Sequence, residues 1–197
     1  DFISQRSISG VLFFDMAQSQ DTSIIVAGVN GYFSQGMSAG GRAYIAKMDT
    51  SYNLIWITEI GDPYQQAKCA RQIIELYDGS MMCLIINTYM GAFSQYASLY
   101  KLTSNGDILW KRDLHSGLNP YHVCDLDMQI SKDGGFLISG FMNTSNKSQY
   151  QAPFFIKTDS LGCDGLYSCM DTTTMMYLQT WEDSVCNGDS VLVSIVV

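Results

Sequence analysis

The chain has 197 residues, of which 47% are hydrophobic and 15% charged, and this apolar content is sufficient for a folded core. Its net charge is −8, with 11 Lys and Arg residues against 19 Asp and Glu residues. Because polyanion binding needs clustered basic side chains and none stand out, nucleic acid is not an expected partner. The terminal apolar run, residues 190–197, is too short to cross a membrane, so we expect no membrane span.

Short runs of β-branched and aromatic residues, separated by Gly, Asn and Asp, predict strands and turns along most of the chain. The first group of expected strands covers residues 11–17, 24–29, 42–48 and 54–60, and the second covers 69–76, 81–89, 97–102 and 108–114. A third group covers 124–130, 136–141 and 152–158. No segment keeps apolar residues at helical spacing over three turns, so the sequence predicts an all-β fold.

These groups of strands are three copies of one repeat. A lysine precedes a turn in each copy, and the three lysines, Lys47, Lys101 and Lys157, lie 54 and 56 residues apart. After the turn, the first two copies enter a strand through Trp56 and Trp110, and the third reaches Leu166 at the matching offset. A period near 50 with four antiparallel strands per unit is typical of the blades of a β-propeller.

Each of these turns begins with a carboxylate or hydroxyl side chain, at Asp49, Thr103 and Asp159. Such a side chain accepts a hydrogen bond from the backbone two residues on. Gly106 and Gly162 stand where a hairpin of this length requires a positive φ, which glycine adopts without steric cost. In the first copy Tyr52 interrupts the pattern, and we expect Asn53 to take the left-handed position. The lysine before each turn alternates with apolar residues, so we expect it to face the solvent.

A second motif begins within the first turn of the third copy and continues into the next expected strand, where residues 133–140 read D-G-G-F-L-I-S-G. Together with the pattern K-x-D-x-x-G-x-x-x-W, it resembles the repeats of β-propeller domains in secreted and cell-surface proteins of Bacteroidota-type Gram-negative bacteria. The resemblance covers about residues 11–166. It implies a protein of the type IX secretion pathway, extracellular or on the outer-membrane surface, whose repeats carry structural rather than catalytic residues.

The repeat also divides the chain into domains. Residues 1–10 are the expected tail of a preceding blade, 11–62, 63–117 and 118–166 are three blades, and 167–197 hold a linker and the start of a C-terminal β domain. A propeller usually has about four to eight blades, so three do not close a ring. We therefore expect an incomplete, C-terminal part of a larger ring, whose remaining blades come from a longer chain or from neighbouring subunits.

Aromatic residues gather between the second and third strands of every copy, which places them on one rim of the expected propeller. They are Tyr32, Phe33, Tyr89, Phe93, Tyr96 and Tyr150. Rings beside Ser, Asn and Gln can stack on sugars or bind a protein partner, because they offer an apolar face with polar edges. Alternatively, the rings pack down on the blade edges and only anchor their loops.

The six cysteines suggest an oxidising compartment. Cys163 and Cys169 lie in loop-like sequence, and we predict a disulfide between them. Cys69 and Cys124 occupy equivalent places in neighbouring copies, so they either form a bridge or remain buried free thiols. Cys83 lies in an apolar strand and is expected to be inert.

Candidates for catalysis or metal binding are few. Asp125 and Asp127 alternate along one expected strand, so their carboxylates could share a face as a cation site or an acid/base pair. The alternative is ordinary alternation, with Cys124, Leu126 and Met128 buried and the two Asp residues facing the channel or the solvent. No nucleophile motif accompanies them, and we expect no catalytic residue, no metal and no cofactor.

Four sites follow the D-S/T-apolar pattern that the resembled proteins use for attaching O-glycans, namely Ser160, Thr172, Ser184 and Ser190. Asp and Ser also build plain turns, which is the alternative. Together, these observations predict a non-catalytic, exported or surface-displayed glycoprotein for adhesion, for glycan or protein binding, or for envelope assembly. A propeller enzyme acting on polysaccharide and a purely architectural subunit are the alternatives.

Overall fold

The computed structural model describes residues 10–31, 41–62, 66–89, 95–114, 122–143, 151–163 and 192–193. All regular elements in these residues are β-strands, which confirms the predicted all-β class. None of this described part forms a helix long and apolar enough to span a membrane.

Three antiparallel sheets of four strands each make up the fold. The first sheet contains β1 (Val11–Gln18), β2 (Ile24–Gly31), β3 (Gly41–Met48) and β4 (Leu54–Ile60). The second contains β5 (Gln66–Glu75), β6 (Met81–Tyr89), β7 (Gln95–Leu102) and β8 (Ile108–Leu114). The third contains β9 (His122–Ile130), β10 (Phe136–Asn143), β11 (Gln151–Lys157) and β12 (Leu192–Val193). Neighbouring strands follow one another in the chain, so each sheet is a meander.

The strand predictions are confirmed, and observed bounds differ from the expected ones by at most three residues. The last strand of the third sheet comes from a distant part of the chain, whereas β4 and β8 follow directly after the turns that end β3 and β7. β12 pairs with β11, with Phe155 opposite Val193 and Ile156 opposite Leu192. Two residues of the segment 167–197 therefore complete the third sheet, whereas Leu166 lies outside the described residues.

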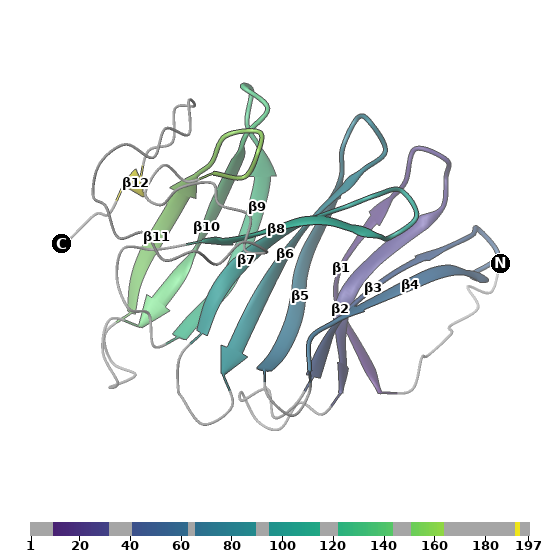
Figure 1. Ribbon diagram of the computed structural model, residues 1–197, viewed down its shortest axis with the longest axis horizontal. Helices are drawn as coiled ribbons and strands as arrows, with labels where there is room; N and C mark the ends of the chain where they lie inside the picture. Colours follow the sequence, from purple (N-terminus) through teal and green to yellow (C-terminus); the bar gives the residue numbers. More distant parts are fainter. Residues whose placement is uncertain are drawn as a thin grey trace, which may run out of the picture.

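The sheets stack face to face in an open row, with the second sheet in the middle (Figure 1). Alternate side chains of each strand point to opposite faces, so the middle sheet contributes to two cores. The core toward the first sheet contains Ile25, Ile45, Ile73, Met81, Cys83, Ile85, Tyr100 and Leu102, and the core toward the third contains Met82, Leu84, Leu99, Met128, Phe136, Ile138 and Ile156. Each fully buried aliphatic side chain contributes about 1.5–3 kcal/mol of transfer free energy.

Two ends of the stack can be distinguished. The turns β1–β2, β3–β4, β5–β6, β7–β8 and β9–β10 lie at one end, which we call the turn end, because every sheet is a meander. The β2–β3, β4–β5, β6–β7, β8–β9 and β10–β11 connections begin and end at the opposite end, which we call the loop end. The β7–β8 hairpin reaches from the second sheet across the first (Figure 1).

Candidate functional site

The first strands of the first and second sheets contact the next sheet in the same way, and we call this contact the bulge joint. A β-bulge interrupts the pairing of β1 just before Asp15, and another interrupts β5 just before Gln72. The carboxylate of Asp15 accepts a hydrogen bond from the backbone N–H of Ile73 at 2.9 Å. In the same way the side-chain carbonyl of Gln72 accepts the N–H of Met128, and its amide donates to Asp127 at 2.9 Å. The residue after each bulge thus binds the backbone of the neighbouring sheet.

The fourth strand of the first sheet makes a second contact, which we call the tryptophan joint. The indole N–H of Trp56 donates to the carbonyl of Ser104 at 3.1 Å, and the hydroxyl of Thr58 donates to the carbonyl of Gly106 at 2.6 Å. The indole ring lies so close to Gly106 that an added Cβ would be 2.7 Å from its Cε3 atom. The Trp and the Gly of the sequence repeat therefore meet across two sheets.

The tryptophan joint recurs between the second and third sheets. An added Cβ on Gly162 would lie 2.8 Å from Cη2 of Trp110. Gly106 and Gly162 have φ values of 86° and 78°, which confirms the predicted left-handed turn position. Two separate reasons thus require glycine at both positions. The backbone is left-handed there, and the Trp ring of the preceding sheet leaves no room for a Cβ atom.

The first sheet departs from this pattern at Tyr52. Tyr52 itself has a φ of 62°, so the expectation that Asn53 would take the left-handed position is wrong. The cause is Asp49, whose Oδ1 accepts the N–H groups of Ser51 and Asn53, both at 2.8 Å, and so fixes the turn around Tyr52. The predicted hydrogen bond to the residue two positions on is confirmed here and at Thr103 and Asp159.

The lysine before each turn is not solvent-facing, and that prediction is wrong. Lys47 is only 7% exposed, and in every sheet the lysine pairs with the Asp of the preceding β-turn. The Nζ–Oδ2 distances are 2.8 Å for Lys47–Asp21, 3.7 Å for Lys101–Asp78 and 2.6 Å for Lys157–Asp133. The aliphatic stem of a lysine can lie along the sheet while its amino group reaches the turn. The lysine of the K-x-D/T motif and the Asp of the turn after the first strand therefore form one ion pair in each sheet.

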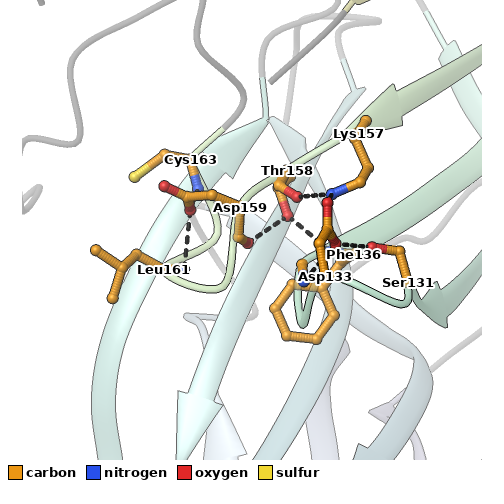
Figure 2. A network of polar contacts seen from close by, with 9 residues as sticks. Ser131, Asp133, Phe136, Lys157, Thr158, Asp159, Leu161 and Cys163 are labelled. Carbon is orange, nitrogen blue, oxygen red and sulfur yellow. Dashed lines mark hydrogen bonds and ion pairs between the residues drawn. The ribbon is translucent and has the colours of Figure 1, made fainter. Parts of the chain in front are cut away.

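The third of these ion pairs sits in a wider network at the turn end (Figure 2). Asp133 also accepts hydrogen bonds from the hydroxyl of Ser131 and, at 3.0 Å, from the backbone N–H of Gly135. Lys157 donates in addition to the carbonyl of Thr158 at 2.8 Å. Hydrogen bonding by Lys157 and Ser131 holds the pKa of Asp133 well below its usual range, as Lys47 and Ser23 do for the pKa of Asp21.

We expect these turn carboxylates to make the fold sensitive to acid. Their pKa values are lower in the folded than in the unfolded chain, where Asp titrates near pH 3.9. Their contribution is therefore complete above about pH 4 and is lost as the pH falls through the folded-state values. Because the Asp side chains are 56–63% exposed, solvent screens each pair and the effect of each is modest.

The measurement is the free energy of unfolding from urea titrations at several pH values between about 5 and 2. We expect it to decrease over that interval, and to decrease less in the variant Asp133→Asn. Asn keeps an acceptor for Gly135 but does not titrate. An identical pH dependence in the variant and the parent chain would contradict this assignment.

A buried polar network lies at the loop end of the middle sheet, and sequence reasoning missed it. The amide of Asn87 donates to the hydroxyl of Ser98, which donates to the carboxylate of Asp113, both at 2.6 Å. Lys111 pairs with Asp113 at 2.6 Å. Asn87 and Ser98 are fully buried, and the side-chain oxygen of Asn87 has no partner among the described residues. The only sequence signal is polar residues that alternate with apolar ones in β6 and β7.

Lys68 of β5 lies on the same face of the middle sheet. Its amino group donates to the hydroxyl of Tyr100 at 3.0 Å, and the residue is only 8% exposed. Burial, together with the positive charge of Lys111, lowers the pKa of Lys68 to about 8. A strongly perturbed amine of this kind is a candidate for functional chemistry.

Most of the predicted rim aromatics fall outside the described residues, namely Tyr32, Phe33, Phe93 and Tyr150, as does the side chain of Tyr89. Tyr96 is described. It stands near the start of β7 at the loop end and is half-buried, and the Nζ atom of Lys111 lies 5.6 Å from its ring centroid. Tyr96 thus has one face against its own sheet, as the anchoring alternative requires, while part of its surface remains accessible.

The cysteines are partly as predicted. Cys163 is buried and disulfide-bonded, while Cys169 lies outside the described residues, so their pairing stays a prediction. Cys69 and Cys83 are buried free thiols, which excludes the bridge between Cys69 and Cys124. Burial raises the pKa of the Cys69 thiol to about 11, which makes it unreactive near neutral pH.

The two candidate carboxylates of β9 take different positions. Asp127 is exposed while Leu126 and Met128 are buried, as ordinary alternation predicts. The side chain of Asp125 lies outside the description, and a bulge separates the pairing of residues 124 and 127. Within the described ranges, no group of three or more His, Cys, Asp or Glu side chains could hold a metal ion. Of the expected O-glycan sites, Ser160 is exposed, and Thr172, Ser184 and Ser190 are not among the described residues.

Comparison with models of known protein families finds no match, and comparison with curated protein sequences finds none either. The resemblance to exported bacterial propeller repeats therefore stays a prediction. The described residues form the same contacts between the first and second sheets as between the second and third.

Proposed function

We propose that the three sheets are consecutive blades of a β-propeller and that the chain is a non-catalytic module for binding or assembly outside the cell. The observation that carries the proposal is the repetition of the joints. Trp56 meets Gly106 as Trp110 meets Gly162, and Asp15 binds the second sheet as Gln72 binds the third. Sheets that join through one repeated contact are rotated by a similar step each time, and this favours a ring over a sandwich.

Two further features support display at a bacterial surface. The disulfide-bonded state of Cys163 is typical of exported proteins, because cytosolic thiols are kept reduced. Ser160, within one of the expected O-glycan motifs, lies exposed in the turn after β11, as an attachment site requires. The localisation that these features favour is extracellular or on the outer membrane of a Gram-negative bacterium.

The loop end is the surface that we assign to ligand binding. The β2–β3, β6–β7 and β10–β11 connections begin and end there, and rigid scaffolds commonly present their binding residues on such loops. Tyr96 offers a half-exposed ring whose other side is held against Lys111, and a ring fixed in this way loses little entropy on binding. Glycans and protein loops are the ligand classes that suit such a surface.

The experiment is a binding assay of the labelled chain on an array of bacterial and host-type oligosaccharides. We expect retention on one class of glycan, and we expect Tyr96→Ala to weaken it by about 5- to 10-fold, which is the usual contribution of one stacked ring. Tyr77→Ala is the matched control, because Tyr77 is 99% exposed at the opposite, turn end. Equal losses in both variants would contradict binding at the loop end.

An enzyme acting on polysaccharide is the second candidate, and the perturbed pKa of Lys68 is the observation that favours it. Release of shorter oligosaccharides during the array experiment, abolished by Lys68→Met, would replace the binding proposal with this one. If the chain neither binds nor cleaves glycans but assembles into larger particles, a purely architectural subunit would be favoured.

A further inference from the structure

Lys68 and Asn87 face each other across β5 and β6 of the middle sheet. They are partners in the antiparallel register of these strands, so their side chains leave the sheet on the same face. The Cβ atoms of such partners are usually about 4.5–5.5 Å apart. Both residues are buried, which places an amine and a carboxamide together away from water. A neutral amine is a nucleophile, and the carbonyl carbon of a carboxamide is a matching electrophile.

The surroundings of Lys68 favour the neutral form of its amine. The Nζ atom donates to the hydroxyl of Tyr100 at 3.0 Å, so its hydrogen-bond partner is a phenol rather than a carboxylate. A buried ammonium group without a carboxylate partner is costly. Burial, together with the positive charge of Lys111, lowers the pKa of Lys68 to about 8. About a tenth of the amine is then neutral at pH 7, and only this form has the lone pair that a nucleophile needs.

The carboxamide of Asn87 is held at its nitrogen only. The Nδ2 atom donates to the hydroxyl oxygen of Ser98 at 2.6 Å and to the backbone carbonyl of Tyr96 at 3.3 Å. The Oδ1 atom is buried and accepts no hydrogen bond from the described residues. A buried carbonyl without a donor is unfavourable. The unreacted pair thus combines two costly groups, an unpaired amine and an unpaired carbonyl, on facing residues.

Asp113 of β8 is connected to this pair through Ser98. The hydroxyl of Ser98 donates to the carboxylate at 2.6 Å, while its oxygen accepts the Nδ2 group of Asn87. The negative charge of Asp113 also acts on Lys68, where it partly offsets the lowering of the pKa. Ser98 therefore stands between a carboxylate that can accept a proton and the nitrogen that would depart, as a proton relay requires.

We propose that Lys68 and Asn87 join in an intramolecular isopeptide bond, with Asp113 as the general base. The flexible stem of Lys68 lets its amine turn from Tyr100 to the facing residue. Nζ then attacks Cγ of Asn87 and forms a C–N bond, while Asp113 takes a proton from Nζ. The proton passes through Ser98 to Nδ2, the bond from Cγ to Nδ2 breaks, and ammonia leaves. An amine and a carboxamide thus give a secondary amide and ammonia, with no oxidant, reductant or co-reactant.

The bond would link two neighbouring strands of the middle sheet at the loop end. It would remove the buried charge of Lys68 and constrain the unfolded chain, as a disulfide does. It would also consume the amine that the enzyme alternative requires. Glycan binding at the loop end needs no such bond, so the isopeptide bond and the proposed binding function can each hold without the other.

The experiment measures the intact mass of the full chain after denaturation and reduction. We expect a mass about 17 Da below that of the sequence, which is the loss of one ammonia. Peptide mapping should show the peptide of Lys68 joined to that of Asn87, with no tryptic cleavage after Lys68. The variants Lys68→Met and Asn87→Ala should have their full masses. Lys101→Met is the matched control, because Lys101 pairs with Asp78 at the turn end, and it should retain the loss.

Asp113→Asn tests the general base, because Asn keeps an acceptor for Ser98 but takes up no proton. The mass is followed over time after cell-free synthesis, and we expect the loss of ammonia to be roughly 100-fold slower than in the parent chain. An unchanged rate would overturn the role of Asp113. A folded parent chain of full mass would overturn the bond itself, and so would a loss that persists in Lys68→Met, since the amide would then have reacted with another group. A chain of full mass that still binds glycans would leave the proposed function intact.

Discussion

Replacement of Gly106 by Ala is expected to lower the free energy of unfolding by about 2–4 kcal/mol. A left-handed backbone costs a residue with a Cβ about 1–2 kcal/mol, and Gly106 has a φ of 86°. The new methyl would also lie 2.7 Å from Cε3 of Trp56 and from Oγ1 of Thr58, and relief of such overpacking usually costs about 1–3 kcal/mol. The measurement is urea unfolding followed by circular dichroism.

Gly79→Ala is the matched control for this substitution. Gly79 also has a left-handed backbone, with a φ of 78°, but nothing lies within 4 Å of an added Cβ. We expect only the backbone cost there, about 1–2 kcal/mol. The difference between the two variants isolates the tryptophan joint. Equal losses of stability would mean that the contact of Trp56 with the second sheet contributes nothing.

Replacement of Asp15 by Ala is expected to lower the free energy of unfolding by about 1–3 kcal/mol, which is the usual cost of a backbone group left without its hydrogen bond. The carboxylate is the acceptor for the N–H of Ile73, a residue that is only 2% exposed. Water therefore has little access to the N–H after the substitution. The readout is again urea unfolding, and hydrogen exchange of the Ile73 amide should accelerate in parallel.

Asp15→Asn tests whether the acceptor rather than the charge is needed. The Asn side chain places a carbonyl oxygen where the carboxylate oxygen lies, as Gln72 does in the second sheet. We expect this variant to retain most of the stability that Ala loses. If Asn were as destabilising as Ala, the bulge joint would depend on charge, and the equivalence of Asp15 with Gln72 would fail.

The tryptophan joint shows which contacts could not be predicted from the sequence. The repeat of Trp56 and Trp110 with Gly106 and Gly162 is visible in the sequence, but sequence alone assigns the Trp to a strand and the Gly to a turn of the same blade. Their contact runs from one sheet to the next, 50 residues along the chain for Trp56 and Gly106. Spacing within a repeat carries no information on which neighbour a side chain reaches.

The misjudged lysines and the missed polar network have a common physical origin. Lys47 was expected in solvent because lysine usually is, yet an Asp from the preceding turn lies 2.8 Å from its amino group and makes burial of the stem favourable. Lys68 and the network around Asn87 escaped notice for the same reason, since burial of a polar side chain depends on partners supplied by other strands. Such partners are known only once the sheets have been assembled.

The sequence by itself determined the all-β class, the position of nearly every strand and the hydrogen bonds within the turns. These features depend on local alternation, on turn chemistry and on neighbours within a few residues, as at Asp49 and Ser51. Only the tertiary structure decided which repeat motifs touch, that the lysines are ion-paired, and that polar side chains such as Asn87 and Ser98 are buried in the middle sheet. Those properties arise from the stacking of sheets, where each contact joins residues that lie far apart in the chain.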